Sequence, residues 1–109
     1  MKMKSEEALK KIDNLVNVLS IDIPEKIEVF GEMYYPKKEI EEPSERTLLK
    51  YEALYDSLRD EIKRMKDVPE DIVEKAIVLR RIVLFLKEYG HTDEIEDKKR
   101  WIKFVRKMG

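Results

Sequence analysis

The chain has 109 residues and a formal net charge of −1, so it fits one domain, residues 1–109, without the basic excess typical of nucleic-acid-binding proteins. It contains no cysteine, which excludes disulfide bonds, thiolate catalysis and cysteine-ligated zinc. Hydrophobic residues make up 42% of the chain and charged residues 43%, so a folded core with a heavily charged surface is expected. The absence of cysteine favours a cytoplasmic protein.

Amide side chains are scarce in this sequence, which has no glutamine and only Asn14 and Asn17. Scarce thermolabile residues beside abundant Lys and Glu are typical of proteins from hyperthermophiles, so a thermophilic source is expected. No run of about 18 uncharged apolar residues occurs, and the sequence therefore predicts no membrane-spanning helix.

The first predicted helix covers residues 5–19. Ser5 stands before two glutamates and is expected to cap it. The apolar side chains of this segment recur at helical spacing and share one face: Leu9, Ile12, Val16 and Leu19.

An arm, residues 20–43, separates the first helix from the second. Ile27 and Val29 alternate with a glutamate, and Gly31-Glu32 suits a two-residue turn with glycine first. The pattern predicts a short β-hairpin over residues 27–35. Because an isolated hairpin is marginally stable, it must lie against another surface, such as the same arm of a second copy. An ordered loop packed by Tyr34 and Tyr35 is the alternative.

The second predicted helix covers residues 44–66 and begins at Ser44. Its apolar residues alternate steps of three and four, which indicates a seam packed along a neighbouring helix. They are Leu48, Tyr51, Tyr55, Leu58, Ile62 and Met65.

The third predicted helix covers residues 69–89, between Pro69 and Gly90. Apolar residues cover about half of its circumference, and on that side only Lys75 interrupts them. A second, narrower apolar stripe holds Val73, Ile77 and Leu84. Two stripes indicate either a central helix or a contact with a second copy, and small chains often complete their core by dimerising. The sequence therefore predicts a homodimer.

Arg80 lies between the two apolar sectors of this helix, with no acidic residue three or four positions away. Three interpretations are open. The side chain can cover apolar surface while its head reaches water, or form a buried or interface ion pair with another helix or subunit. It can also bind an anion, since guanidinium matches carboxylate and phosphate in a two-pronged geometry. The two structural interpretations are favoured.

The fourth predicted helix covers residues 93–108 and is strongly amphipathic. Its basic residues gather on one side and are candidate contacts for an anion or a nucleic acid: Lys99, Arg100, Lys103, Arg106 and Lys107. Acidic residues at the start and basic residues at the end also complement the helix dipole. A solvated face is therefore favoured over a binding face.

Catalytic constellations are not found in the sequence. His91 is the only histidine, and the residues around it supply no closed set of metal ligands. The acidic run Glu39, Glu41, Glu42 and Glu45 lacks the ligand spacing of a calcium loop. The sequence predicts no enzyme activity, no metal and no cofactor.

Three passages together carry a family resemblance: "IPEKIEVFGE", "VPEDIVEKAIVLRRIVLFLKEYG" and "KKRWIKFVRKMG". In order and spacing they are similar to a small family of archaeal proteins classed only as a domain of unknown function. The resemblance implies an archaeal, mainly helical protein and assigns no site residue.

The sequence thus predicts an all-α, four-helix domain with a short β-hairpin arm between its first two helices. The favoured function is that of a non-enzymatic, homo-oligomeric interaction or scaffold module with an unidentified protein partner. The alternative is a nucleic-acid-binding accessory protein that uses the basic face of residues 93–108. No membrane contact is expected.

Overall fold

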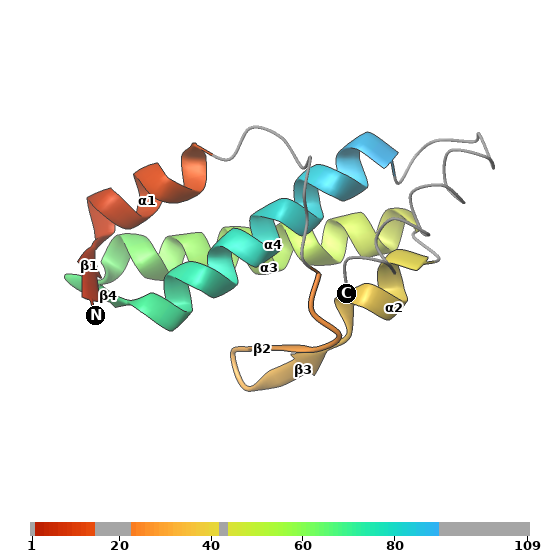
Figure 1. The fold of residues 1–109 in the computed structure, drawn as a ribbon, viewed down its shortest axis with the longest axis horizontal. Coiled ribbons are helices and arrows are strands. Elements are labelled where there is room, and N and C mark those ends of the chain that lie inside the picture. Colours follow the sequence, from red (N-terminus) through yellow and green to blue (C-terminus); the bar gives the residue numbers. More distant parts are fainter. Residues whose placement is uncertain (1, 15–22, 42–43, 90–109) are drawn as a thin grey trace.

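Two long helices form the frame of the fold. The computed structural model describes residues 2–14, 23–41 and 44–89. Within these residues, α3 (Glu45–Arg64) and α4 (Glu70–Tyr89) lie side by side, and α1 (Ser5–Asp13) packs against both (Figure 1). The prediction of a mainly helical protein is confirmed.

The start of α3 is fixed by a reciprocal pair of hydrogen bonds. The backbone N–H of Thr47 donates to Ser44 Oγ at 3.4 Å, and the backbone N–H of Ser44 donates to Thr47 Oγ1 at 3.2 Å. Such a capping box satisfies amide groups that the first turn leaves unbonded. Further along, the predicted apolar seam faces the core. Its central members are buried: Tyr51, Tyr55, Leu58 and Ile62.

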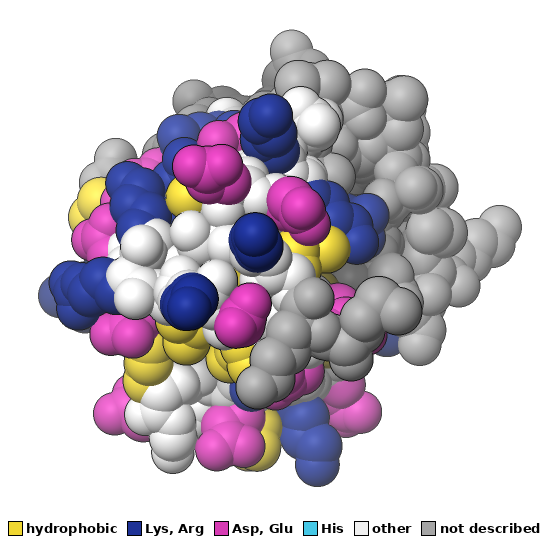
Figure 2. All heavy atoms as spheres, turned by 90° about the vertical axis from the view of Figure 1, so that its left-hand side faces the viewer, with side chains coloured by type: hydrophobic (Ala, Val, Ile, Leu, Met, Phe, Trp, Pro, Cys, Tyr) yellow, Lys and Arg dark blue, Asp and Glu magenta, His cyan; other side chains and the backbone are white. Residues whose placement is uncertain are grey.

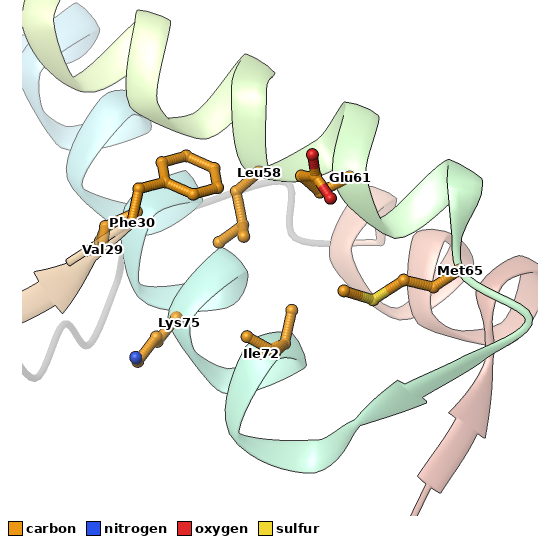
Figure 3. Close-up of a pocket in the computed structure, with 7 residues that line it drawn as sticks. All are labelled: Val29, Phe30, Leu58, Glu61, Met65, Ile72 and Lys75. Carbon is orange, nitrogen blue, oxygen red and sulfur yellow. The ribbon is translucent and has the colours of Figure 1, made fainter.

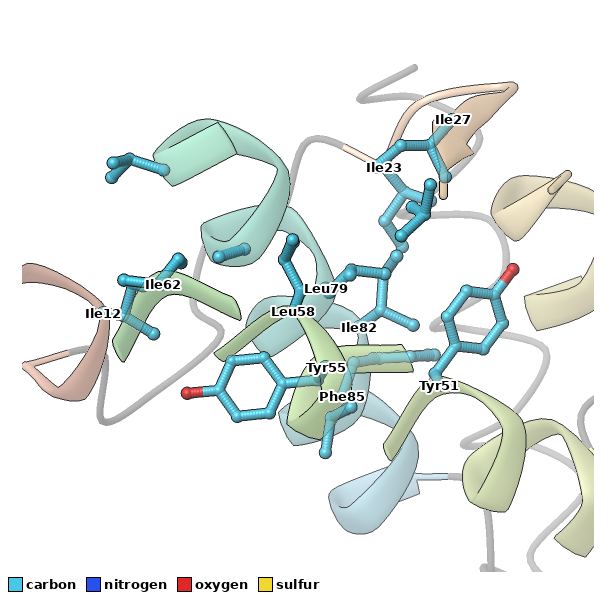
Figure 4. Close-up of a cluster of buried hydrophobic side chains, with 14 of the residues drawn as sticks. Ile12, Ile23, Ile27, Tyr51, Tyr55, Leu58, Ile62, Leu79, Ile82 and Phe85 are labelled. Atoms are coloured by element: carbon cyan, nitrogen blue, oxygen red, sulfur yellow. The ribbon is translucent and has the colours of Figure 1, made fainter. Parts of the chain in front are cut away.

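The apolar half of α4 is also buried, as its sequence predicts. The fully or nearly fully buried residues of this helix are Val73, Ala76, Leu79, Ile82, Val83, Phe85 and Leu86. Ile77 and Leu84, from the second stripe, are half-buried against the same core. Because α4 contacts both α1 and α3, one chain already covers much of this second stripe. Figure 4 shows the core where these helices meet the hairpin.

A short antiparallel ribbon ties the N-terminal strand to the α3–α4 connection, and the sequence analysis did not predict it. Strand β1 (Lys2–Lys4) pairs with β4 (Asp67–Pro69), and Met3 lies opposite Val68. Val68 is completely buried, so the ribbon forms part of the core. The predicted cap at Ser5 is wrong. The chain passes directly from β1 into α1, with Lys4 at the capping position and no side-chain hydrogen bond there.

The predicted hairpin is present in the arm, but its turn lies one residue earlier than expected. Strand β2 (Ile27–Val29) pairs with β3 (Glu32–Tyr34), and Val29 lies opposite Glu32. The two turn residues are therefore Phe30 and Gly31, rather than Gly31 and Glu32. Both have positive φ, 52° and 78° respectively, as in the turn type whose twist matches a two-residue hairpin.

The arm also contains a helix that the sequence analysis missed. Helix α2 (Pro36–Glu41) begins directly after the hairpin, with proline at its first position, where the missing N–H costs nothing. Ile40 anchors it in the core with 1% exposure. A helix of six residues is too short to show an apolar period.

Two of the predicted elements reach beyond the part of the chain that the structure describes. The predicted fourth helix, residues 93–108, lies outside it, as does the predicted continuation of the first helix to residue 19. Among the described helices, none combines the length and apolar character needed to cross a lipid bilayer. The described chain is mainly helical with two small antiparallel sheets, so it is not purely α-helical.

Candidate functional site

Arg80 lies on α4 with its guanidinium over the ring of Tyr55 on α3. Its Cζ is 5.6 Å from the ring centroid, a distance typical of a cation–π contact. Its Nε is buried without a hydrogen-bond partner, and no ion pair joins Arg80 to another described residue. The residue is half-buried, with its guanidinium over the Tyr55 ring rather than in an ion pair with a described residue.

We expect Arg80→Met to change the free energy of unfolding by no more than about 1 kcal/mol, and to raise it if the unpaired Nε is costly. Methionine keeps most of the contact with Tyr55, because its thioether packs well against aromatic rings. Urea denaturation of both proteins measures the difference. A loss above about 2 kcal/mol would show that the guanidinium belongs to a bonded network.

A second cluster joins α1 to α3 next to Arg80. Arg59 donates to both carboxylate oxygens of Asp13, at 3.1 Å for Nη2 to Oδ2, and its Nη1 also donates to the hydroxyl of Tyr55 at 3.3 Å. These hydrogen bonds, and secondarily the charges of Arg59 and Arg80, hold the pKa of Asp13 below its usual value. The pair therefore stabilises the fold above the ordinary pKa of Asp, about 3.9, and loses this effect as the pH falls through the lower folded value.

Lys50 holds the arm onto α3. Its Nζ donates to Glu39 Oε1 on α2 at 2.7 Å and lies 5.1 Å and 5.8 Å from the ring centroids of Tyr34 and Tyr51. Burial, and next the neighbouring Glu39 carboxylate, raise the pKa of the Tyr51 hydroxyl well above its usual range. These contacts join β3, α2 and α3, and they fix where the hairpin sits.

The hairpin turn forms one wall of an open pocket of about 410 Å³ between α3 and α4 (Figure 3). Most of its lining is apolar, and these side chains converge in the figure: Val29, Phe30, Leu58, Met65 and Ile72. The ring of Phe30 is directed toward α3, and it remains 54% exposed. A pocket of this size and character falls within the range of small-molecule sites.

Two charged side chains complete the lining, and Figure 3 places them on different sides of the pocket. Glu61 on α3 has a partner, because Arg64 Nη1 lies 3.5 Å from its Oε1. Lys75 on α4 has no ion-pair partner among the described residues, and in Figure 3 its amine points away from the other lining side chains. The pocket thus combines an apolar floor with one lysine that forms no ion pair with another described residue.

Comparison with protein-family models, with curated proteins and with solved structures found no match. Roles for these residues therefore rest on their geometry alone.

The other sequence-predicted site residues lie outside the described part of the chain. These are Lys99, Arg100, Lys103, Arg106 and Lys107, together with His91. Nucleic-acid binding through the basic face accordingly stays a prediction. On the end of the molecule that carries β1 and β4, basic and acidic side chains are interspersed, with small hydrophobic patches between them (Figure 2). Among the described residues, no three acidic or histidine side chains are grouped to hold a metal ion.

The pocket was missed by sequence analysis, although one signal for it was visible. Lys75 interrupts the apolar sector of its helix, where a charge needs either an exit to water or a ligand. No sequence pattern places Phe30 beside Ile72 and Met65, since that contact depends on how the arm folds back.

Proposed function

We propose that the protein is a non-enzymatic interaction module that acts as a homodimer through the outer face of its hairpin arm. One observation carries the proposal: two large apolar side chains of the arm, those of Met33 and Tyr35, are 47% and 50% exposed. Exposed apolar groups gathered on one element mark contact surfaces.

The hairpin also offers strand edges for pairing. Strands β2 and β3 pair with each other, and among the described residues neither has a further strand beside it. An unpaired edge is a template for another strand, and two copies of one edge can pair antiparallel about a two-fold axis. The partner that fits this geometry is a second copy of the chain.

The charges on the two edges favour β3 as the contact strand. A two-fold axis at Met33 places Met33 opposite its own copy and Glu32 opposite Tyr34, so no like charges meet. The equivalent axis on β2 places Glu28 opposite Glu28, and like charges directly opposite each other destabilise a sheet. The proposed dimer therefore joins the two β3 strands.

Sedimentation equilibrium at micromolar concentration should give twice the chain mass of 13.1 kDa. Met33→Lys should shift the protein toward the monomer, because the axis would then bring two cations together. Folding should survive this change, since Met33 is 47% exposed and exposed substitutions usually have small effects.

Leu49→Lys is the matched control, because Leu49 is 63% exposed on α3, outside the hairpin strands, and undergoes the same apolar-to-cation change. It should leave the dimer intact. A wild-type protein that sediments only at 13.1 kDa would exclude the homodimer. A dimer that persists in Met33→Lys would exclude the arm as its interface.

A further inference from the structure

We propose that the pocket beneath the hairpin turn is a binding site for a small amphipathic anion, namely an aliphatic carboxylate. Its hydrocarbon part would lie among Phe30, Met65 and Ile72. Its carboxylate would contact the amine of Lys75, whose flexible four-carbon stem can turn toward the opening of the pocket. This inference is independent of the proposed dimer, which uses the outer face of β3.

The apolar wall has a feature that packing alone does not explain. Phe30 occupies a turn position with φ 52°, where Asn or Gly is preferred and a side chain costs roughly 1–2 kcal/mol. The ring is also 54% exposed, so its burial offsets this cost only in part. Backbone strain of this kind clusters at ligand-binding sites. A ligand in the pocket would cover the exposed part of the ring.

The charges of the lining select the sign of the head group. Glu61 is compensated by Arg64 on its own helix, with 3.5 Å between Oε1 and Nη1. Among the described residues, Lys75 is the only basic one in the lining, and it forms no ion pair with another of them. A carboxylate at the rim would accept hydrogen bonds from its ammonium group, and such charge-assisted bonds are stronger than neutral ones. A lysine that merely reaches water would confer no preference for an anionic head.

The size of the pocket sets the size of the ligand. A volume of about 410 Å³ is near the lower end of the range for small-molecule sites. A single aliphatic chain of medium length suits it better than a folded peptide segment. Decanoate is therefore a suitable probe, with decylamine and decan-1-ol as probes that keep the chain and change only the head.

The test uses the full chain, labelled with ¹⁵N, and titrations below the micelle concentration of each probe. Decanoate should shift the amide resonances of Phe30, Ile72 and Lys75 and leave those of α1 unchanged. It should bind roughly three- to tenfold more tightly than decan-1-ol, the gain typical of one partly exposed charged contact. Decylamine should bind more weakly than either. Shifts elsewhere in the chain, or equal binding of all three probes, would overturn the proposal.

Two variants distinguish the contribution of the charged contact at Lys75 to binding from that of the apolar wall at Phe30. Lys75→Gln should remove the preference for decanoate over decan-1-ol, whereas Lys66→Gln, the same change at an exposed lysine outside the lining, should leave it unchanged. Phe30→Asn should weaken the binding of both decanoate and decan-1-ol. The hairpin should be retained, because Asn-Gly is the favoured pair for this turn. Unchanged affinity in either pocket variant would refute the site. Met33→Lys should bind decanoate as the wild type does, so failure of the dimer does not decide this result.

Discussion

Leu79→Ala is expected to lower the free energy of unfolding by about 2–5 kcal/mol, the range for truncating a large side chain in a close-packed core. Leu79 has no exposed surface, and it lies at the centre of α4 beside Leu58 and Ile82 (Figure 4). The substitution removes three carbon atoms and leaves a cavity that the paired helices cannot easily close. Urea denaturation followed by circular dichroism measures the loss.

Leu49→Ala is the control for this experiment. Leu49 also lies within a 20-residue helix, so the change in helix propensity is the same, but it is 63% exposed. Its substitution should change stability by no more than about 0.5 kcal/mol. Comparable losses at Leu49 and Leu79 would mean that burial does not distinguish the two positions, and the described packing of α4 would be wrong.

The long helices could be predicted because their pattern repeats over many turns. Twenty residues of α3 contain a seam in which Tyr51 and Leu58 recur at steps of three and four, and strands cannot satisfy that period. The buried half of α4 was predicted by similar reasoning, from apolar residues that cover about half of its circumference. Periodicity over this length overrides local ambiguity, and the boundaries agree to within about two residues at the ends the structure describes.

The short elements could not be predicted for the opposite reason. Helix α2 and strands β1 and β4 have six, three and three residues, which is less than two periods of a helix and barely one alternation of a strand. The pairing of Met3 with Val68 also joins segments far apart in the chain, so no local pattern encodes it. The hairpin turn was misplaced by one residue because phenylalanine rarely adopts a positive φ.

The pocket could be predicted from the sequence only in part. Lys75 stands out in the sequence, because a cation within an apolar sector contradicts the pattern around it. Its neighbours at the site come from three elements that the fold brings together, and the position of Phe30 depends on the Lys50 contacts that hold the arm. A sequence can therefore mark the residue without showing the pocket.

Val68→Asp is expected to cost more than about 4 kcal/mol at pH 7, because it would bury a charge without a partner. Val68 is completely buried where β4 pairs with β1, and the opposite residue, Met3, packs against the same core. A buried carboxyl resists ionisation, so the cost relative to wild type should be smaller at pH 4 than at pH 7. Urea denaturation of both proteins at pH 4 and pH 7 measures the difference in their free energy of unfolding. A variant that is unfolded at pH 7 without urea would agree with the expected cost.

Val68→Thr separates charge from shape at the same position. Threonine retains the branched shape and the β propensity of valine but buries a neutral hydroxyl, so it should cost about 1–3 kcal/mol and show no such dependence on pH. A loss below 1 kcal/mol for Val68→Asp would mean that β1 and β4 do not pair as a buried ribbon. Strand β1 would then contribute little to the free energy of unfolding, and the α3–α4 connection would be held in place by the helices alone.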